Sequence, residues 1–502
     1  MVLVVANSEA TAPRRYGNFR RPESPGVLGL GTAGTVILVG GALIIALVVA
    51  LGLWLVAAPL VLVWLLALGA VGVRDRHGRN LAMRVGNRVG WSMTRRRGQN
   101  LYRGGPTTHG SFTPPGILAT TKLHEARDAY DRPFAVIEYP AVGHYAVAVE
   151  VSPEGASLVD ADQVDVWVAG WGQWLANLGQ ELGVVGAQVT VETAPDTGAR
   201  LKREVQRRLD PNAPDLAKAV LGQVVHDYPA GASLDRAWVT VTFRGQSAAG
   251  PKRTTADVIA DLASRLPGLT ETLAGSTGAG AATPVTAQGL CEIVRTAYDP
   301  GAAALLDEIH DSGQQPDLSW NDAGPAAAEA SWDTYRHDGA VSRSWYMSSA
   351  PRGEVFANVL TRLLSAHADV DRKRIAIMYQ PLSSVEAAAV VEADKRAADL
   401  RVNATNRPSS RALAAARASR ATADEEARGA GLVDFGMVIT ATVTDPDRLT
   451  AARVAVENLA AGARLLIRPA WGSQDAAFAA GLPLGLVLRS HSRVPQEIRR
   501  YL

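Results

Sequence analysis

The stretch VLGLGTAGTVILVGGALIIALVVALGLWLVAAPLVLVWLLALGAVGV, residues 27–73, decides the architecture of this chain. It runs for 47 residues without an Asp, Glu, Lys, Arg or His. A continuous helix of that length would be about 70 Å long, whereas the hydrocarbon core of a bilayer is about 30 Å thick. We therefore expect a transmembrane hairpin with spans at about residues 27–50 and 54–73, rather than a buried soluble hairpin or a cleaved signal peptide.

Arginines flank the apolar stretch on both sides. Four of them precede it, at Arg14, Arg15, Arg20 and Arg21, and a longer series begins at Arg74. Because positive residues favour the cytoplasmic side of a membrane, both ends of the hairpin should lie there. The prediction is a multi-pass protein of the plasma membrane with a cytoplasmic N-terminal tail, residues 1–26, and a cytoplasmic C-terminus.

The segment that follows the hairpin is strongly basic. Residues 1–104 hold 13 Arg against Glu9, Glu23 and Asp75, a net charge of +10, so the remainder of this +2 chain carries −8. Residues 74–116, a basic juxtamembrane segment and linker, place Leu81, Val85 and Val89 at helical spacing between arginines, which is typical of an amphipathic helix on an anionic leaflet. A positive flank without a defined lipid site and a contact with exported nucleic acid are the alternatives. The predicted membrane-surface residues are Arg76, Arg79, Arg84, Arg88, Arg95, Arg96 and Arg97.

The cytoplasmic body should be of the α/β or α+β class. Strand-like segments alternate with helical ones, in a first block at residues 117–312 and a second at 326–490, followed by a tail at 491–502. The second block contains a helix at 353–366 and a helical pair at 385–428, and the stretch 269–283 suggests an exposed loop. Both blocks have the order strand, helix, strand, helical pair, strand, helix, strand, which suggests two related halves.

Sequence motifs for catalysis are missing. The nearest match to a phosphate-binding loop, GQSAAGPK at Gly245–Lys252, has Pro251 where the loop needs a residue with a backbone N–H. No H-E-x-x-H or G-x-S-x-G motif occurs, and the single cysteine, Cys291, excludes a Cys-rich metal site supplied by this chain alone. We therefore predict a non-catalytic protein with no catalytic, cofactor-binding or metal-binding residues and no cofactor.

Two parts of the chain carry a resemblance to known secretion proteins. RRYGNFRRPESPG (residues 14–26), followed at once by the hairpin, resembles the PrgI/VirB3-type front end of actinobacterial membrane proteins encoded beside conjugative type IV secretion genes. APRGEVFANVLTRLL (350–364), RIAIMYQPLS (374–383), the helical pair and QDAAFAAGLPLG (474–485) are similar to the part of VirB4-type proteins that precedes their ATPase motor. Since the chain stops soon after Gly485, the resemblance implies an anchor and a platform without a motor.

The resemblance implies a membrane scaffold subunit of a secretion or conjugation apparatus. Its partners would be the anionic bilayer, a separate VirB4-type ATPase, other channel subunits and further copies of itself, with nucleic acid as a secondary contact. An EccE-like membrane component of type VII secretion is the first alternative, and a membrane-tethered enzyme of unrecognised class is the second.

The segment QDAAFAAGLPLG supplies the predicted docking residues. In the motor proteins a similar segment joins platform to ATPase, so Phe478 and Leu482, at i and i+4, would share a helix face and anchor the partner. The alternative is that Phe478 completes the core of the second block.

Overall fold

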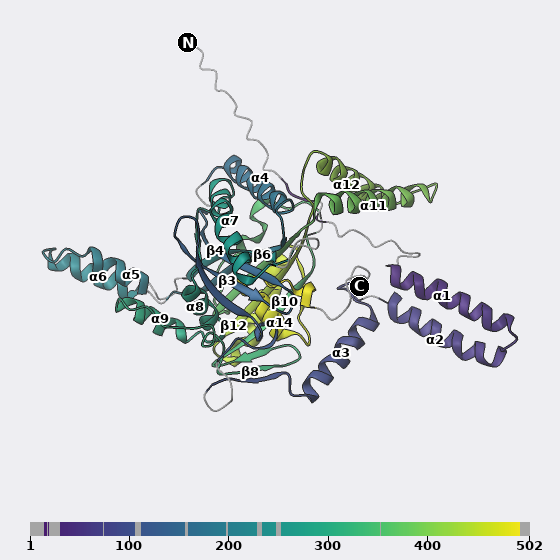
Figure 1. Cartoon of the computed structure of the whole chain (residues 1–502), viewed down its shortest axis with the longest axis horizontal. Coiled ribbons are helices and arrows are strands. Elements are labelled where there is room, and N and C mark those ends of the chain that lie inside the picture. Colours follow the sequence, from purple (N-terminus) through teal and green to yellow (C-terminus); the bar gives the residue numbers. More distant parts are fainter. Residues whose placement is uncertain are drawn as a thin grey trace, which may run out of the picture.

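A computed structural model gives the fold of this chain (Figure 1). It describes residues 15–17, 19, 31–73, 75–105, 112–155, 159–196, 199–227, 233–246, 253–351 and 353–491. Most of the predicted N-terminal tail and nearly all of the tail at 491–502 therefore lie outside the described residues. A helix pair projects from one side of a large mixed α/β body (Figure 1).

The helix pair consists of α1 (Gly31–Ala50) and α2 (Trp54–Gly72), joined by a tight turn in which Gly52 has a φ of +74°. Helix α2 is long and apolar enough to cross a membrane, and the apolar part of α1, Gly34–Ala50, is slightly shorter. The two helices confirm the predicted helical hairpin at the level of secondary structure, and Pro59 lies inside α2.

One 13-stranded sheet, whose ladders are all antiparallel, runs through the body, in the order β1-β8-β9-β10-β12-β11-β5-β6-β4-β3-β2, with β13 on β10 and β7 on β4. The first half supplies β2 (Lys122–Arg127), β3 (Pro133–Tyr139), β4 (His144–Ser152), β5 (Val184–Pro195), β6 (Ser233–Arg244) and β7 (Ala281–Pro284). The second half supplies β8 (Ala327–Ala330), β9 (Tyr335–His337), β10 (Ala340–Ser349), β11 (Arg372–Pro381), β12 (Val433–Val443) and β13 (Leu466–Pro469). The short β1 (Leu101–Arg103) comes from the segment predicted to be a linker and pairs with β8.

The strand order is the same when read outward from the centre in either direction. Strands β5 and β11 pair antiparallel at the centre, flanked by β6 and β12, then by β4 and β10, and then by β3 and β9. The accessory strands β7 and β13 occupy matching places on β4 and β10. The two blocks therefore do not form separate sheets, because β5 and β11 join them into one.

Helices occupy corresponding positions in the two halves. The first half has α4 (Ala161–Leu178), the pair α5 (Ala199–Arg208) and α6 (Asp215–Asp227), and α7 (Thr255–Ser276). The second has a short 3-10 turn (Ala357–Leu360) with α10 (Thr361–Leu364), the pair α11 (Ser384–Asn403) and α12 (Ser410–Ala427), and α13 (Leu449–Gly462). The remaining helices are α3 (Leu81–Arg96), α8 (Ala287–Tyr298), α9 (Ala302–Asp311) and α14 (Gln474–Ala480).

Local sequence explains several helix boundaries. Capping boxes begin α7 at Thr254 with Asp257 and α11 at Ser383 with Glu386, which satisfies backbone N–H groups that a first helical turn leaves free. The helical pair predicted at 385–428 is confirmed as α11 and α12.

Two local predictions are wrong. Most of the stretch 269–283 is not an exposed loop, because α7 continues to Ser276, with Leu273 in the core, and β7 follows. The helix expected at 353–366 is reduced to the 3-10 turn and the single turn of α10.

Candidate membrane-surface site

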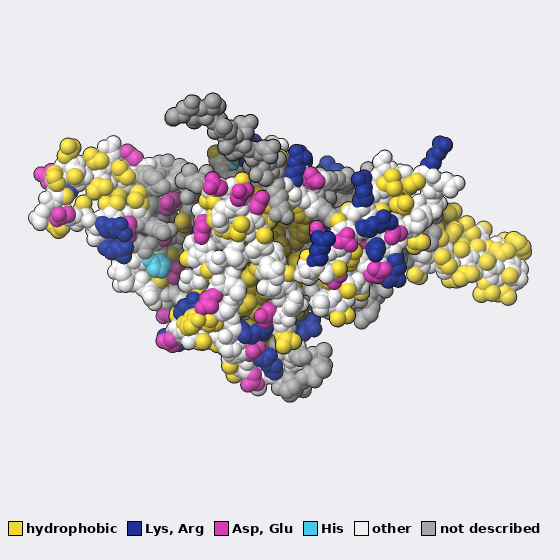
Figure 2. All heavy atoms as spheres, turned by 90° about the horizontal axis from the view of Figure 1, so that it is seen from above, with side chains coloured by type: hydrophobic (Ala, Val, Ile, Leu, Met, Phe, Trp, Pro, Cys, Tyr) yellow, Lys and Arg dark blue, Asp and Glu magenta, His cyan; other side chains and the backbone are white. Residues whose placement is uncertain are grey.

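The outer surface of α1 and α2 is apolar and uncovered. Leu43, Leu47 and Leu66 are 61–66% exposed and Leu55 is 94% exposed. Figure 2 shows hydrophobic side chains gathered on the projecting end of the molecule. An uncovered apolar surface of this extent marks a site of contact with a membrane or a partner.

A glycine allows α1 and α2 to approach closely. A Cβ atom on Gly41 would lie 2.0 Å from Cδ1 of Trp64, so no larger residue fits there without displacing the indole. The Trp64 Nε1–H donates to the carbonyl of Ile37 at 2.8 Å, which joins the helices through a hydrogen bond. Sequence reasoning did not identify this pair, although glycine is common where apolar helices meet.

Helix α3 begins after a tight turn that leaves the helix pair. The Asp75 carboxylate accepts the backbone N–H groups of His77 and Arg79 at 2.8 and 3.0 Å. Asn80 is the N-cap, and its Oδ1 accepts the N–H of Met83 at 2.9 Å. These local contacts fix the position at which α3 starts.

One side of α3 contacts the body. The Arg88 guanidinium lies 4.5 Å from the ring centroid of Trp332, and Trp91 packs on the same ring at 6.2 Å between centroids. Gly472 passes beneath this cluster, where a Cβ would lie 2.8 Å from Trp332. The contacts hold α3 against the sheet domain at the end from which the helix pair projects (Figure 1).

An adjacent side of α3 is an exposed apolar stripe. Leu81, Val85, Val89 and Met93 recur every four residues and are 41–60% exposed. The predicted amphipathic character is therefore present, with Met93 extending the stripe by one turn. Such a stripe flanked by arginines can lie in the headgroup region of an anionic bilayer.

The predicted arginines are not all placed alike. Arg84, Arg88 and Arg95 lie along one flank of the stripe, and Arg88 on that flank contacts Trp332 of the body. Arg76, Arg96 and Arg97 are also exposed, whereas Arg79 is half-buried in the turn before the helix. The structure thus brings Arg84, Arg88 and Arg95 together and leaves the others at the two ends of α3.

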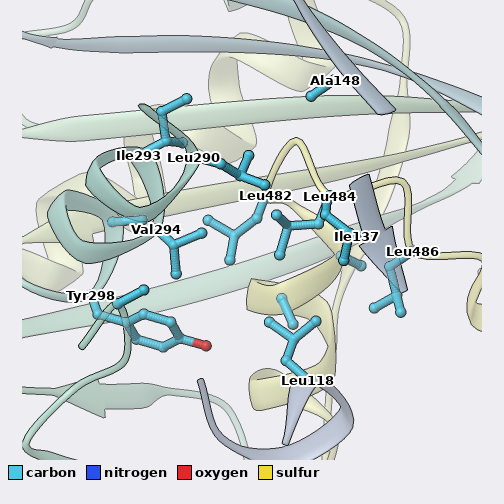
Figure 3. Close-up of a cluster of buried hydrophobic side chains, with 14 of the residues drawn as sticks. Leu118, Ile137, Ala148, Leu290, Ile293, Val294, Tyr298, Leu482, Leu484 and Leu486 are labelled. Atoms are coloured by element: carbon cyan, nitrogen blue, oxygen red, sulfur yellow. The ribbon is translucent and has the colours of Figure 1, made fainter. Parts of the chain in front are cut away.

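Phe478 and Leu482 lie in the core rather than on a surface. Both are 0% exposed. Phe478 contacts the rings of Tyr298 and Tyr335 at 4.9 and 5.2 Å between centroids, and Leu482 points into the cluster formed with Leu290 and Val294 (Figure 3). The prediction that these two side chains anchor an ATPase does not fit this placement, and the core alternative does.

A buried polar layer lies beneath the segment that contains Leu482. Thr240 and Thr242 of β6 donate to the carbonyls of Pro483 and Gly485 at 3.1 and 2.7 Å, and the Gln188 amide donates to the carbonyl of Leu482 at 2.7 Å. These hydrogen bonds fasten the segment across the centre of the sheet. The period-two Thr pattern of β6 was a usable signal, but period-two polar residues in a strand usually face solvent.

A buried ion pair joins the two central strands. Glu192 of β5 accepts hydrogen bonds from Arg372 and Arg374 of β11, each at 2.7 Å. Burial alone would raise the pKa of Glu192, but the two guanidinium groups outweigh it and hold that pKa below its usual value. Arg374 also lies 5.1 Å from the ring centroid of Phe478, so the central pair and the core are in contact.

A second buried polar chain involves His337. Its Nδ1–H donates to the carbonyl of Tyr298 at 2.5 Å, which leaves Nε2 to accept from the Ser342 hydroxyl at 2.7 Å. Burial lowers the pKa of His337 to about 4, so the imidazole is neutral at physiological pH. Within the described residues, His, Cys, Asp and Glu side chains form no group of three that could hold a metal ion.

Comparisons with known proteins reach only the N-terminal part of the chain. Residues 23–82 match a family model described as a domain of unknown function, DUF8461. That match covers the helix pair and the turn before α3. No curated protein matches the chain.

Proposed function

We propose that this chain is a non-catalytic, membrane-anchored scaffold subunit of an export machine. In this proposal α1 and α2 both cross the plasma membrane, and α3 lies on its inner leaflet. The body is then a cytoplasmic platform that docks a separate secretion ATPase.

The observation that carries the topology is a contact between the segment before the hairpin and the body that follows it. Tyr16, which precedes α1, exchanges both backbone hydrogen bonds with Val355 of the body at 2.8 Å. The Tyr16 hydroxyl also donates to Asp165 of α4. Residues before the first helix and after the second can meet in this way only on one side of a membrane, which requires an even number of spans.

Reporter fusions test this topology. Reporters at the N-terminus and the C-terminus of the full chain should both report the cytoplasm. A result that places them on opposite sides would mean a single span and would overturn the proposed anchor.

The leaflet contact of α3 is tested with site-specific labels on the full chain in nanodiscs. A spin label at Val85→Cys should be shielded from a water-soluble relaxation agent in phosphatidylglycerol discs. The label at Asn87→Cys, another exposed position of α3 that lies away from the stripe, is the matched control and should stay accessible. Equal shielding of Val85→Cys in neutral and anionic discs would show that the arginines do not direct this contact.

The ATPase partner is proposed on the resemblance of residues 350–364, 374–383 and 474–485 to the VirB4-type platform. The full chain should co-purify with a VirB4-type ATPase of the same cell. Co-purification with an EccC-type ATPase instead would favour the type VII alternative. Because Phe478 and Leu482 are buried, the contact must use other residues.

We also propose that the two halves of the body descend from a duplication. Support comes from the matched order of strands and helices about the β5–β11 pair. An experimental structure in which 144–284 and 340–469 failed to superpose by rotation about that pair would contradict this proposal.

A further inference from the structure

The helical pair of each half forms an arm that stands away from the sheet. In the first half the arm consists of α5 and α6, and in the second half of α11 and α12. Helices α11 and α12 pack against each other and bury small residues such as Ala398, Ala416 and Ser419. The two arms extend on opposite sides of the body, and the α11–α12 arm is the one on the side from which α1 and α2 project (Figure 1).

Charge is distributed unevenly along the α11–α12 arm. Its tip, residues 400–417, contains four arginines and no Asp or Glu, a net charge of +4. The parts nearer the body, residues 384–399 and 418–427, contain seven Asp or Glu against three Lys or Arg, a net of −4. The ion pair between Arg420 and Asp399, at 2.8 Å, lies at the boundary. The arm as a whole is neutral, so its positive charge belongs to the tip.

Local structure gathers the features of the tip at one end of the arm. The connection between the helices is short, residues 404–409, and Ser409 is the N-cap of α12. The Ser409 hydroxyl accepts a backbone N–H of the first turn at 3.2 Å. Leu400 lies in the last turn of α11 and Leu413 in the first turn of α12, so both are next to the connection that carries Arg407.

Apolar side chains are exposed among the arginines of the tip. Leu400 is 70% and Leu413 is 43% exposed, and Arg407 and Arg417 are exposed too. At the surface of an anionic bilayer, leucines can enter the boundary between headgroups and acyl chains while arginines reach the lipid phosphates. A nucleic-acid backbone would use the arginines but would leave the leucines in water. The combination therefore favours lipid.

We propose that the tip of the α11–α12 arm binds anionic lipid headgroups of the inner leaflet. This proposal rests on the proposed function, because it needs α1 and α2 to span the membrane beside the arm. The anchor holds the tip close to the leaflet, and the resulting high effective concentration makes a small contact sufficient. The body is then attached at two separate places, which fixes the orientation of its sheet relative to the membrane.

Fluorescence quenching in nanodiscs tests this contact on the full chain. A fluorophore at Asn406→Cys, an exposed position of the tip, reports contact with lipids that carry a quencher on the headgroup. Val385→Cys, 79% exposed at the root of the same arm, is the matched control, and native Cys291 is only 1% exposed. In phosphatidylglycerol discs the tip label should be quenched several-fold more strongly than the root label. In phosphatidylcholine discs the two labels should be quenched alike.

Two matched charge reversals separate the tip from the rest of the arm. Arg407→Glu combined with Arg417→Glu should reduce quenching of the tip label to the level of the root label. Arg396→Glu combined with Arg428→Glu changes the net charge equally near the root and should leave that quenching unchanged. All four side chains are exposed, so neither double variant should alter the melting temperature much.

Several outcomes would overturn the proposal. They are equal quenching of the two labels in phosphatidylglycerol discs, equally strong quenching of the tip label in phosphatidylcholine discs, or quenching that survives the reversal at the tip. A tip label that responds to a DNA duplex but not to phosphatidylglycerol would assign the arginines to nucleic acid instead. Loss of the chain from the discs would overturn the anchor and this proposal with it, whereas retention with an unquenched tip label would overturn this proposal alone.

Discussion

Phe478 sits among three aromatic rings, at 4.9 Å from Tyr298, 5.2 Å from Tyr335 and 4.7 Å from His337 between centroids. Phe478→Ala should therefore cost about 3–5 kcal/mol of unfolding free energy. Thermal melting of the full chain in detergent measures the loss. Phe356→Ala, at a 45% exposed position, is the control and should change the melting temperature little. An unchanged melt for Phe478→Ala would restore this side chain as a candidate docking residue.

Two buried histidines predict a loss of stability in mild acid. Burial lowers the pKa of both His144 and His337 to about 4, from an ordinary 6.5. The unfolded chain therefore binds protons first as the pH falls, so their stabilising contribution is complete above about pH 6.5 and is lost progressively towards pH 4. Each shift corresponds to roughly 3 kcal/mol, at about 1.4 kcal/mol per pKa unit.

Denaturant midpoints of the full chain between pH 4 and 8 measure this effect. His337→Asn should lower stability at pH 8 and also flatten the slope between pH 6.5 and 4. His226→Gln, at an exposed position, controls for the loss of an imidazole. A slope that is identical in His337→Asn and the unaltered chain would contradict the assignment.

At the residue scale, the sequence predicted exposed features better than it predicted contacts in the interior. The arginine series and the spacing of Leu81, Val85 and Val89 predicted an exposed amphipathic helix, because these side chains act locally. The partners of Phe478 and Glu192 lie 141–182 residues away in sequence, and no local pattern encodes such pairs.

At the scale of elements, the segment at Gly485 crosses the sheet with no room for a side chain. Gly485 has a φ of +67°, and a Cβ there would lie 2.4 Å from the Thr242 hydroxyl oxygen and 3.0 Å from the Cβ of Ala146. Gly485→Ala should therefore combine backbone strain with a steric clash. We expect it to lower the free energy of unfolding by about 2 kcal/mol or more, which thermal melting of the full chain would detect.

Gly462→Ala is the matched control for this substitution. It lies at the end of α13 with nothing within 4 Å of the added atom, and its φ is outside the left-handed region. Little change or a slight gain in stability is expected there. Equal melting of the two variants would mean that the segment at 482–486 does not rest on the sheet as described.

Periodicity was a good guide to the elements that carry strong patterns. The helical pair at 385–428 and the amphipathic helix after the hairpin are both present. The errors came where composition conflicted with tertiary packing. Residues 269–276 are rich in Gly, Thr and Ser, yet they are helical because Leu269 and Leu273 reach the core of the first half.

At the scale of the whole molecule, sequence order indicated two blocks but not their connection. Their similar element order was visible along the chain. The pairing of β5 with β11 was not, because strand partners that lie about 190 residues apart leave no local trace. The largest core also draws on both halves, with Ile137 and Phe478 in one cluster.

A single sheet and a shared core predict that the body unfolds as one cooperative unit. The β5–β11 ladder runs from Thr193 opposite Lys373 to Ala187 opposite Tyr379, and the Glu192–Arg374 ion pair lies next to its first end. Fluorophores at Val166→Cys in the first half and at Val385→Cys in the second, both exposed, should therefore report the same denaturant midpoint in the full chain. Two separate midpoints would show that the halves are independent domains.

Breaking the ion pair between β5 and β11 provides a second test of cooperative unfolding with the same two fluorophores. Glu192→Gln leaves Arg374 buried without its counter-ion, which should cost about 3–5 kcal/mol. Because the pair lies on the seam between the halves, both fluorophores should shift together. Glu150→Gln is the control, since its partner Arg236 is 37% exposed and the pair is worth less than about 1 kcal/mol. If Glu192→Gln shifted the denaturant midpoint of only one fluorophore, the two halves would not unfold together. The body would then consist of two units that unfold independently.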